Sequence, residues 1–552
     1  MAPSKFVPVR IAPLGGLGEI GLNLMVLVCG GSALVIDAGV MFPPEREFGG
    51  GLLIPEMRFL ADSALKLEGV VLTHAHEDHI GALPYLLERF PAPVYGTPVT
   101  LAFVRRSQVD KGFESADLRT MTPGTTFDLG PFNIEPLRVT HSTPDSVALA
   151  IRTAAGLIVH SGDFKIDPAP VDGVNFDRER FAQLGEEGVD LLLSDSTNVE
   201  REGRTPSESS LKPVLRDLLT RTRGRFFLSS FSSHIHRIRQ TAEIAHETGR
   251  YVVPLGRRMA QSVRIGIETG QLNLPPGVFI EPAEADFIEP RRLVYLAGGS
   301  QGEPSSSMAR LAGDTHPTVH LDERDVVVLS SRFIPGNERT INSLVNQLCK
   351  RGAQVYYQAV APVHVSGHAS RDELSELIRM LRPRHFVPIH GEYRHLARHL
   401  EVAAAAGVPL RNCHLLENGD TLVMTDGEVR RGRIVPVGRV AAEGEEHGAP
   451  DLIRERRALA HDGTVVAVVA ISSRTGEIVA GPDLISRGVV GIDSAANLAR
   501  AKAEVRDRLR ALNGAVRHND EQVRDEMARA LRRYFSETTG RRPLIVPYVM
   551  EV

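Results

Sequence analysis

The sequence has few cysteines and no long uninterrupted apolar stretch. Its three cysteines, Cys29, Cys349 and Cys413, are widely separated and form no CxxC pair, which argues against a disulfide framework and a cysteine zinc site. This usage fits a reducing cytoplasm, the compartment that we expect. The most apolar stretch, residues 23–42, is interrupted by Gly30-Gly31 and Asp37, so we expect a hairpin of two strands there and no membrane span. The N-terminus also lacks the charged-then-apolar pattern of a signal peptide.

An excess of basic residues is also missing. The formal net charge is −4, whereas a dedicated non-specific nucleic-acid binder usually carries a large positive charge. Any site for a polyanion must therefore be local. The 552 residues, 42% of them hydrophobic and 24% charged, describe an ordinary globular chain of three or four domains.

Short apolar runs such as VVLT and LIVH dominate residues 1–200. Continuous runs of this kind are typical of strands covered on both faces, so we expect a layered α/β sandwich. A second α/β region extends to about residue 363, with helices expected at 210–221 and 235–248. A strand at 385–392 and a helix at 393–406 follow, and residues 439–462 have the charged, glycine-containing composition of a linker with a short helix. The remainder, with a helix at 495–512, reads as a small α/β domain.

The sharpest signal is the segment His74-Ala75-His76-Glu77-Asp78-His79, which follows the strand VVLT and precedes a helix expected at 80–90. Three histidines and an aspartate in six residues are costly to bury without partners, and metal ions supply such partners. Alternation along the strand end sends His74 and His76 to the same side, whereas Asp78 and His79 can face a second ion. Glu77 has no matching role. Three further strand ends carry Asp37, His141 and Asp163, in LVIDAG, VTHS and HSGDFK.

An HxHxDH motif after a hydrophobic strand, followed by these residues in order, resembles the metallo-β-lactamase superfamily. The resemblance implies an α/β fold, the αββα sandwich, and two divalent metal ions per chain. One ion would take His74, His76 and His141, and the other Asp78 and His79, with Asp163 bridging both. Asp37 would orient a ligand or the catalytic water, with a plain strand-end aspartate as the alternative. Nitrogen and oxygen donors favour Zn²⁺, and Mn²⁺ or Mg²⁺ are the alternatives for turnover.

Three later positions resemble the β-CASP nuclease branch of that superfamily: Asp195 in LLLSDSTN, His368 in HVSGHAS and His390 in PIHGE. The resemblance implies that His390 completes the shell of the second metal and that the middle α/β region is an insertion. Asp195 would hold His368 as an imidazolium, and His368 would protonate the leaving 3′-oxygen. A lone histidine is more often structural, so the interpretation depends on the joint occurrence of the three motifs.

Two segments, FSSHIHRIRQ and HVSGHAS, resemble the ribonuclease J family in particular, and the resemblance extends over essentially the whole chain. In that family such segments grip the 5′-monophosphate of the terminal nucleotide and the adjoining backbone. A serine-rich turn and a glycine turn are the alternative interpretations. The resemblance implies the following substrate-binding residues: Ser233, His234, Ile235, His364, Val365, Ser366, Gly367 and His368.

The implied function is a cytoplasmic ribonuclease with 5′→3′ exonuclease activity on 5′-monophosphorylated RNA and some endonuclease activity, acting in mRNA decay and rRNA maturation. A homodimer or higher oligomer through the C-terminal domain, and complexes with other RNA-decay proteins, are also implied. The alternatives are a β-CASP nuclease acting on DNA and a non-catalytic subunit of an RNA-decay complex. The expected domains are a metallo-β-lactamase domain at 1–208 and 365–438, an inserted β-CASP domain at 209–364, a linker at 439–462 and a C-terminal α/β domain at 463–552.

Overall fold

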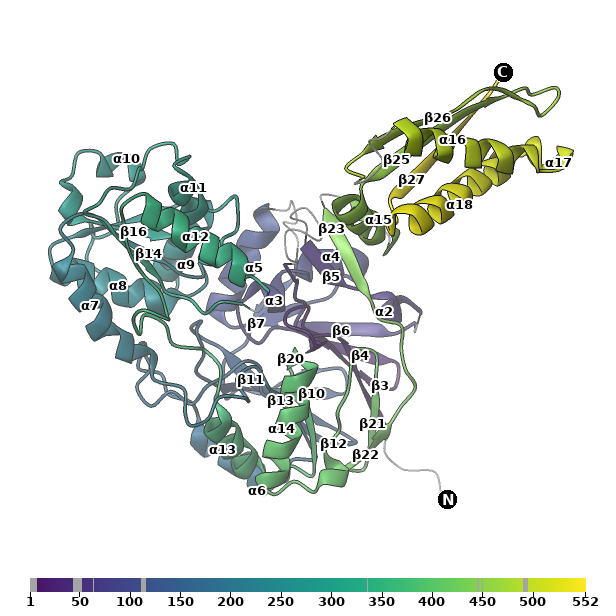
Figure 1. Ribbon diagram of the computed structural model, residues 1–552. Helices are drawn as coiled ribbons and strands as arrows, with labels where there is room; N and C mark the ends of the chain where they lie inside the picture. The colour runs from purple at the N-terminus through teal and green to yellow at the C-terminus, as the bar shows by residue number, and fades with distance from the viewer. Residues whose placement is uncertain are drawn as a thin grey trace. The chain divides into compact units, whose positions relative to one another are not determined.

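The computed structural model describes residues 7–42, 52–62, 64–110, 116–334, 336–443, 446–448, 450–489 and 495–552. The chain forms two compact units, one of Met1–Met41 and Ile54–Arg439, the other of Phe42–Leu53 and Val440–Val552. Figure 1 shows the course of the chain through its helices and strands. Among the described residues, no helix combines the length and the apolar character that crossing a bilayer requires.

Two sheets face each other in the first unit. One has the strand order β22-β21-β1-β3-β4-β6-β7-β8 and the other β19-β13-β12-β11-β10-β9. The strands of the first sheet are β1 (Val9–Gly15), β3 (Leu24–Cys29), β4 (Ser32–Ile36), β6 (Lys66–Val71), β7 (Val94–Gly96), β8 (Leu118–Thr120), β21 (Leu422–Thr425) and β22 (Glu428–Arg431). Those of the second are β9 (Phe127–Leu129), β10 (Phe132–Arg138), β11 (Val147–Thr153), β12 (Gly156–His160), β13 (Leu191–Asp195) and β19 (His385–Ile389).

Inward-facing side chains of both sheets form one core, in which Leu27 and Leu34 pack with Phe132, Ile151 and other apolar residues. The expected hairpin is confirmed, since β3 and β4 pair antiparallel around Gly30-Gly31. The expected helix at 80–90 is broken into two: α3 ends at Ile80 and α4 begins at Leu83, because Gly81 caps the first and Pro84 occupies the first turn of the second. Helices of this domain are α2 (Arg58–Asp62), α3 (Glu77–Ile80), α4 (Leu83–Arg89), α5 (Pro98–Asp110), α6 (Arg178–Glu187), α13 (Arg371–Leu381) and α14 (Tyr393–Ala405).

The middle region is an insertion, as predicted. Strand β19 pairs in parallel with β13, from Leu191 opposite His385 to Asp195 opposite Ile389, so the chain leaves the sandwich after β13 and returns beside the same strand. The inserted region contains a parallel sheet of order β15-β16-β14-β17-β18. Its strands are β14 (Phe226–Ser229), β15 (Tyr251–Leu255), β16 (Leu293–Ala297), β17 (Val326–Leu329) and β18 (Gln354–Tyr356).

Helices cover both faces of the inserted sheet (Figure 1). Phe226 and Leu228 pack with α7 (Leu211–Arg221), α8 (Ile235–Glu247) and α9 (Arg257–Glu268), whereas Phe227 packs on the other face with α10 (Pro282–Ala285), α11 (Ser307–Gly313) and α12 (Glu338–Lys350). Strand residues alternate between faces, so this sheet is buried on both sides. The apolar run FFLSSF therefore forms a central strand, as its composition predicts.

The second unit contains a three-stranded sheet, β26-β25-β27, with helices on one face. Its elements are β25 (Thr464–Ile471), β26 (Ile478–Arg487), α16 (Ala495–Arg510), α17 (Gly514–Arg517), α18 (Asp520–Thr539) and β27 (Leu544–Glu551). The stretch expected to be a linker contains α15 (Pro450–Asp462) and also two short strands, β23 (Arg439–Glu443) and β24 (Glu446–Gly448). The α/β fold expected from the sequence is confirmed: two facing sheets with helices form a sandwich that contains an inserted α/β domain, and the second unit is a small α/β domain.

Candidate metal centre and phosphate-binding segments

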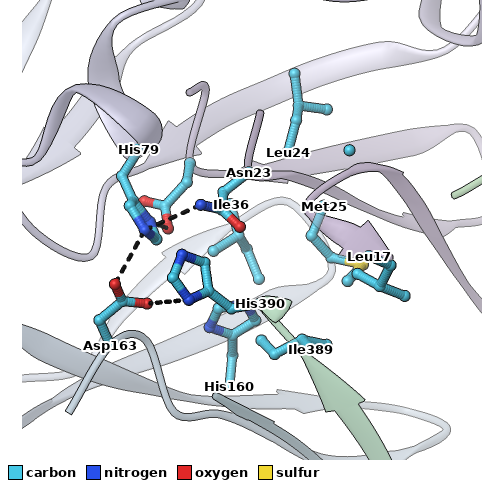
Figure 2. A pocket seen from close by; sticks show the side chains of 12 residues that line it. Leu17, Asn23, Leu24, Met25, Ile36, His79, His160, Asp163, Ile389 and His390 are labelled. Atoms are coloured by element: carbon cyan, nitrogen blue, oxygen red, sulfur yellow. Dashed lines mark hydrogen bonds and ion pairs between the residues drawn. The ribbon is translucent and has the colours of Figure 1, made fainter. Parts of the chain in front are cut away.

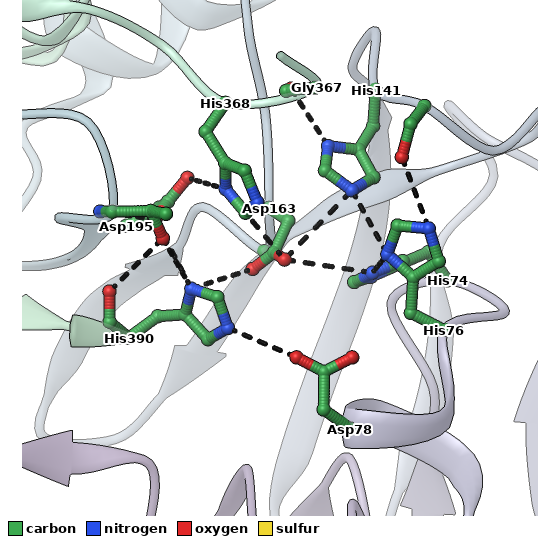
Figure 3. Close-up of polar contacts among 12 residues, drawn as sticks. His74, His76, Asp78, His141, Asp163, Asp195, Gly367, His368 and His390 are labelled. Carbon is green, nitrogen blue, oxygen red and sulfur yellow. Dashed lines mark hydrogen bonds and ion pairs between the residues drawn. The ribbon is translucent and has the colours of Figure 1, made fainter. Parts of the chain in front are cut away.

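Four side chains from three strand ends converge on one point. The segment after β6 supplies His74 and His76, the loop after β10 supplies His141, and the loop after β12 supplies Asp163. One donor atom from each lies within 4.8 Å of the others. The Nε2 atom of His74 is 3.0 Å from Nδ1 of His76, which is 3.2 Å from Nε2 of His141 (Figure 3). A metal ion bound at this point would be coordinated by the lone pairs of several of these nitrogen atoms at once.

The opposite nitrogen of each histidine is held by the protein. Nδ1 of His74 is 3.0 Å from the hydroxyl of Thr73, and Nε2 of His76 is 3.1 Å from the hydroxyl of Ser142. Nδ1 of His141 lies 2.8 Å from the carbonyl oxygen of Gly367, which can accept its proton. Such bonds fix the tautomer and ring orientation of a histidine that binds metal. The three inward-facing nitrogens are therefore oriented as ligands.

A second group of donors, from Asp78, His79 and His390, lies beside the first. Nε2 of His390 is 3.4 Å from Oδ2 of Asp78, and Nε2 of His79 is 3.7 Å from the same oxygen. Asp163 contacts both groups: its Oδ2 is 3.3 Å from Nε2 of His79 and 3.7 Å from Nε2 of His74. Figure 2 shows Asp163 between His79 and His390. The geometry thus brings together every residue that the sequence predicted as a ligand.

Asp37 forms a hydrogen bond with His79, a member of this second group. Its Oδ2 accepts from Nδ1 of His79 at 2.7 Å and from the hydroxyl of Thr73 at 2.8 Å, and its Oδ1 accepts from the backbone N–H of Thr73 at 2.8 Å. Asp37 thus accepts two hydrogen bonds at Oδ2 and one at Oδ1. Asp37 therefore orients His79 and Thr73.

Burial keeps the first three histidines neutral. It lowers the pKa of His76 to about 4 and the pKa values of His74 and His141 well below the ordinary value. A neutral imidazole has the lone pair that a metal ion binds. These side chains therefore present ligand atoms at neutral pH.

In the second group the pKa values of the two histidines are raised, not lowered. Burial lowers the pKa of His390, but the charge of Asp163 and the bonds with Asp195 and Asp78 raise it to about 10. Burial likewise opposes protonation of His79, and three carboxylates, Asp163 first, hold its pKa well above the usual value. The buried carboxylates thus require positive charge, which a divalent cation supplies in place of the two protons. The donor set fits divalent metal ions.

Asp195 and His368 form a pair next to this centre. Nδ1 of His368 lies 2.8 Å from Oδ2 of Asp195, and the His368 ring stacks on that of His390 with centroids 5.4 Å apart. Oδ1 of Asp195 accepts from the backbone N–H and the hydroxyl of Thr197 at 2.9 and 2.7 Å. Burial would raise the pKa of Asp195, but the charge of His368 and the bonds from His368 and His390 hold it well below the usual value. Both carboxylate oxygens are therefore engaged, with His368 held beside the metal ligands.

The two segments expected to bind phosphate lie near each other. The pKa of His234 falls well below the ordinary value, chiefly by burial and then by the charges of Arg237, His236, His364 and His76. The Nδ1 atoms of His234 and His364 have no hydrogen-bond partner among the described residues. Each segment thus contains a buried imidazole nitrogen whose hydrogen-bonding capacity is not used by the described residues.

Ser366 and Gly367 are fixed in the second segment. The hydroxyl of Ser366 accepts from Nδ2 of Asn198 at 2.8 Å and from the backbone N–H of His368 at 3.2 Å, so its own proton remains free to donate. A Cβ atom on Gly367 would lie 2.8 Å from Cε1 of His141, which explains the glycine. The side chain of Ser233 is partly exposed at the start of α8. The side chains of Ile235 and Val365 lie in the apolar core of the inserted domain, so only their backbone groups could contact a phosphate.

A buried ion pair supports the first segment. Arg237, with no exposed surface, donates from Nε and Nη2 to the two carboxylate oxygens of Glu208 at 2.6 and 3.0 Å. Its Nη1 donates to the carbonyl oxygen of Ser330 at 3.1 Å. Nη2 also lies 3.2 Å from Nε2 of His234, which can accept its proton. The pair therefore fixes the His234 ring. Supporting roles of Glu208, Arg237, Thr73, Thr197 and Asn198 were not predicted from the sequence. The contacts of Arg237 with Glu208 and of Asn198 with Ser366 join segments 29 and 168 positions apart, which no local pattern reveals.

Comparison with known proteins follows the same division of the chain. Residues 19–177 match the family described as "Metallo-beta-lactamase superfamily", and 223–348 match "Ribonuclease J, beta-CASP domain". Residues 352–413 match "Zn-dependent metallo-hydrolase RNA specificity domain", and 451–552 match "Ribonuclease J C-terminal domain".

Similar proteins are named ribonuclease J. The chain is 38% identical to the ribonuclease J of Mycobacterium tuberculosis over 545 residues, which cover 98% of this chain and 97% of the relative. It is 37% identical to that of Thermus thermophilus, with 98% and 95% covered, and 36% identical to that of Helicobacter pylori, with 98% and 78% covered. A crystal structure of a protein of unknown function from Enterococcus faecalis shares the fold, with a TM-score of 0.55, 16% identity and coverage of 76% of this chain and 100% of the other.

Proposed function

The chain belongs to the ribonuclease J family, and on that premise we propose that it is a metal-dependent ribonuclease that hydrolyses phosphodiester bonds in RNA. The observation that carries the proposal is the convergence of the metal-type donor groups with the Asp195–His368 pair. A hydrolase acting at phosphorus needs electrophilic assistance, a nucleophile and a proton for the leaving oxygen. The residues around Asp163 are suited to all three.

We propose that His74, His76, His141 and Asp163 hold one divalent ion and that Asp78, His79, His390 and Asp163 hold a second. The ligand types favour Zn²⁺, with Mn²⁺ or Mg²⁺ as alternatives for turnover. Ions bound there supply Lewis acidity toward the phosphoryl oxygens and a water of lowered pKa. Asp37 keeps the His79 ring in place through its 2.7 Å contact with Nδ1.

His368 is the proposed proton donor. Because Asp195 binds its Nδ1, the other ring nitrogen, Nε2, is the atom free to face a substrate. When the bond between phosphorus and the 3′-oxygen breaks, that oxygen takes the Nε2 proton of His368. Asp195, an ionised carboxylate, stabilises the imidazolium before transfer and fixes its tautomer, as a positioned carboxylate does for a general acid–base histidine.

The proposed substrate is 5′-monophosphorylated RNA, shortened from its 5′ end, with some internal cleavage. The unpartnered Nδ1 atoms of His234 and His364 and the free hydroxyl proton of Ser366 support a phosphate site close to the metal centre. The backbone and hydroxyl of Ser233, and the backbone at Gly367, would complete it. A site that holds the terminal phosphate near the ions enforces stepwise removal of nucleotides. Roles in mRNA decay and rRNA maturation follow for a cytoplasmic enzyme of this kind.

We also propose a homodimer formed through the C-terminal domain. One face of its sheet packs on α16 and α18 through residues such as Val469 and Ile545. On the other face Val466 lies opposite both Ile485 and Val546, and Val468 lies opposite Tyr548. Ile485, Val546 and Tyr548 are 53, 42 and 56% exposed. Contiguous exposed apolar surface of this kind marks an association site.

A divalent-ion screen on matched oligonucleotides tests the function. Purified protein stripped of metal and reloaded with Zn²⁺, Mn²⁺ or Mg²⁺ is incubated with RNA and with DNA of the same sequence, and the products are resolved by length. We expect mononucleotides from 5′-monophosphorylated RNA. Cleavage of DNA alone would identify a DNA nuclease instead, and absence of cleavage with every ion would favour a non-catalytic role in an RNA-decay complex.

A further inference from the structure

Arg332 is held in a fixed position in the loop that follows β17. The amide of Gln301, itself buried, clamps this loop: Nε2 donates to the Ser331 hydroxyl at 3.2 Å and to the Arg332 carbonyl oxygen at 2.8 Å. Its Oε1 accepts from the backbone N–H of Ile334 at 2.9 Å. An arginine on a clamped loop is better prepared to bind a ligand than one on a free surface, because less conformational entropy is lost.

Asn198 connects Arg332 to the proposed phosphate segment. Nη1 of Arg332 donates to Oδ1 of Asn198 at 2.7 Å. Nδ2 of the same amide donates to the hydroxyl of Ser366 at 2.8 Å and to the carbonyl oxygen of His368 at 3.0 Å. One buried side chain thus separates the guanidinium from the segment that contains the proposed general acid.

Arg201 and Arg332 share the partner Asn198: the backbone N–H of Arg201 donates to its carbonyl oxygen at 2.9 Å, and Arg332 donates to its Oδ1 at 2.7 Å. Both arginine side chains are partly buried. Burial lowers the pKa of each guanidinium, and the charges of Arg201 and Arg394 lower that of Arg332 further. Both remain charged at any physiological pH.

No carboxylate pairs with either side chain within the part of the chain that the structure describes. The carboxylate of Glu200 is close enough to raise the pKa of Arg332, but it forms its ion pair with Arg394. It also lies 3.6 Å from Nε2 of His395. Other arginines of the same region are paired: Arg204 binds Glu376 at 2.7 Å, and Arg371 lies 3.6 Å from Glu202. Two partly desolvated, like charges without a counterion are unfavourable unless an anion binds them.

We propose that Arg201 and Arg332 form a second anion site that binds an internal phosphodiester of the RNA strand, separate from the phosphate at Ser366. The inference rests on the proposed function, since it names a further contact with the same substrate. Arginine presents a planar fork of N–H donors that matches two phosphate oxygens, which suits a backbone contact. Nη1 of Arg332 is occupied by Asn198, so the contact would use its Nη2 and Nε together with Arg201.

Equilibrium binding of a short single-stranded RNA tests this inference. Metal-free full-length protein avoids turnover, and the variants are Arg201→Gln, Arg332→Gln and the double variant. We expect Kd to rise about tenfold for each single variant, the size of one charge-assisted hydrogen bond. The slope of log K against log salt should become shallower by about 0.7 in the double variant, the value for one phosphate on a single strand.

Arg204→Gln is the matched control, since this residue lies in the same loop and is paired with Glu376. Its Kd and salt slope should stay at the wild-type values, and thermal unfolding of all variants should confirm an intact fold. Unchanged Kd and slope in the double variant would overturn the inference. Equal losses in the Arg204→Gln control would overturn it too, because they would indicate a diffuse basic surface.

RNA with a 5′-hydroxyl end separates the two phosphate sources. If the arginines bind an internal phosphodiester, the loss of affinity is the same for 5′-hydroxyl and 5′-monophosphate RNA. If the loss disappears with 5′-hydroxyl RNA, the arginines bind the terminal phosphate and the assignment to the internal one is wrong. Binding is measured without metal and therefore without cleavage. If the proposed nuclease activity is wrong, wild-type protein will bind the RNA but will not cut it after metal is restored, so the two failures can be distinguished.

Discussion

Oδ2 of Asp195 and Nδ1 of His368, 173 positions apart in the chain, lie 2.8 Å from each other. Asp195 ends β13, the last strand before the insertion, and His368 lies in the segment that returns to the sandwich. The pair therefore forms only when the chain returns from the inserted domain to the second sheet, where β19 pairs with β13. The proposed general acid is thus positioned where the sandwich and the inserted domain meet.

Replacing Asp195 by asparagine should lower kcat by a factor on the order of 10² to 10⁴, the usual contribution of general acid–base catalysis. The amide cannot stabilise the imidazolium, whereas the metal ligands remain. Metal content and RNA affinity should therefore stay near wild type. Asp217→Asn, at an exposed ion pair with Arg221, is the control and should keep full activity. A kcat equal to the wild-type value would remove the pair from the mechanism.

His76→Ala should abolish cleavage with little loss of fold. The change opens the first donor group while β6 and its neighbours keep their pairing. Elemental analysis should show less bound metal, and circular dichroism should be unchanged. His246→Ala, at the exposed end of α8, controls for loss of an imidazole. Activity close to wild type, with metal-free protein as the blank, would contradict the metal assignment.

The candidate ligands could be identified from the sequence because they follow local rules. His74, His76 and His141 end or follow strands whose apolar runs are readable, and the hairpin around Gly30-Gly31 has its own turn signal. Contacts such as Asn198 to Ser366 depend on packing between distant segments, so no local pattern could reveal them. For the same reason Ile235, inside a promising motif, could not be recognised as a core side chain.

Arg237→Met should destabilise the inserted domain by about 3–5 kcal/mol, because Glu208 would remain as a buried charge without its partner. Urea unfolding with a probe in this domain measures the loss. The double variant Glu208→Leu and Arg237→Met should recover much of the stability, since both charges are then removed. It should still bind RNA poorly, because His234 loses its contact with the guanidinium. Equal stability of the single variant and wild type would show that the pair is not desolvated.

Tyr548→Asp should dissociate the proposed dimer, because it places a charge in the exposed apolar face of the C-terminal sheet. Light scattering should give the mass of one chain, with unfolding temperature unchanged. Ser536→Asp, on an exposed position of α18, adds the same charge elsewhere and should leave the mass unchanged. An oligomer of equal mass in both variants would place the interface outside this sheet face.

Monophosphorylated RNA should be trimmed faster than triphosphorylated RNA of the same sequence. A 5′-monophosphate is a compact dianion that the short donors at Ser366 and the two unpartnered imidazoles can surround, whereas a triphosphate must place two further charged groups in the same space. Initial rates of nucleotide release, with each RNA in excess, measure the preference. Equal rates would contradict a site for the terminal monophosphate.

Ser366→Leu should suppress trimming from the 5′ end while internal cleavage largely survives. The buried hydroxyl has one free proton to donate, and leucine removes that donor and fills the space without replacing any proposed metal ligand. Ser366→Thr keeps the hydroxyl and should retain more of the exonuclease activity than the leucine variant. Substrates with a blocked 5′ end report internal cleavage alone, so the two activities can be measured separately. If Ser366→Leu lowers both activities equally, the serine positions His368 and does not bind a terminal phosphate. The hydrogen bond that the Ser366 hydroxyl accepts from the backbone N–H of His368 would then explain the whole effect.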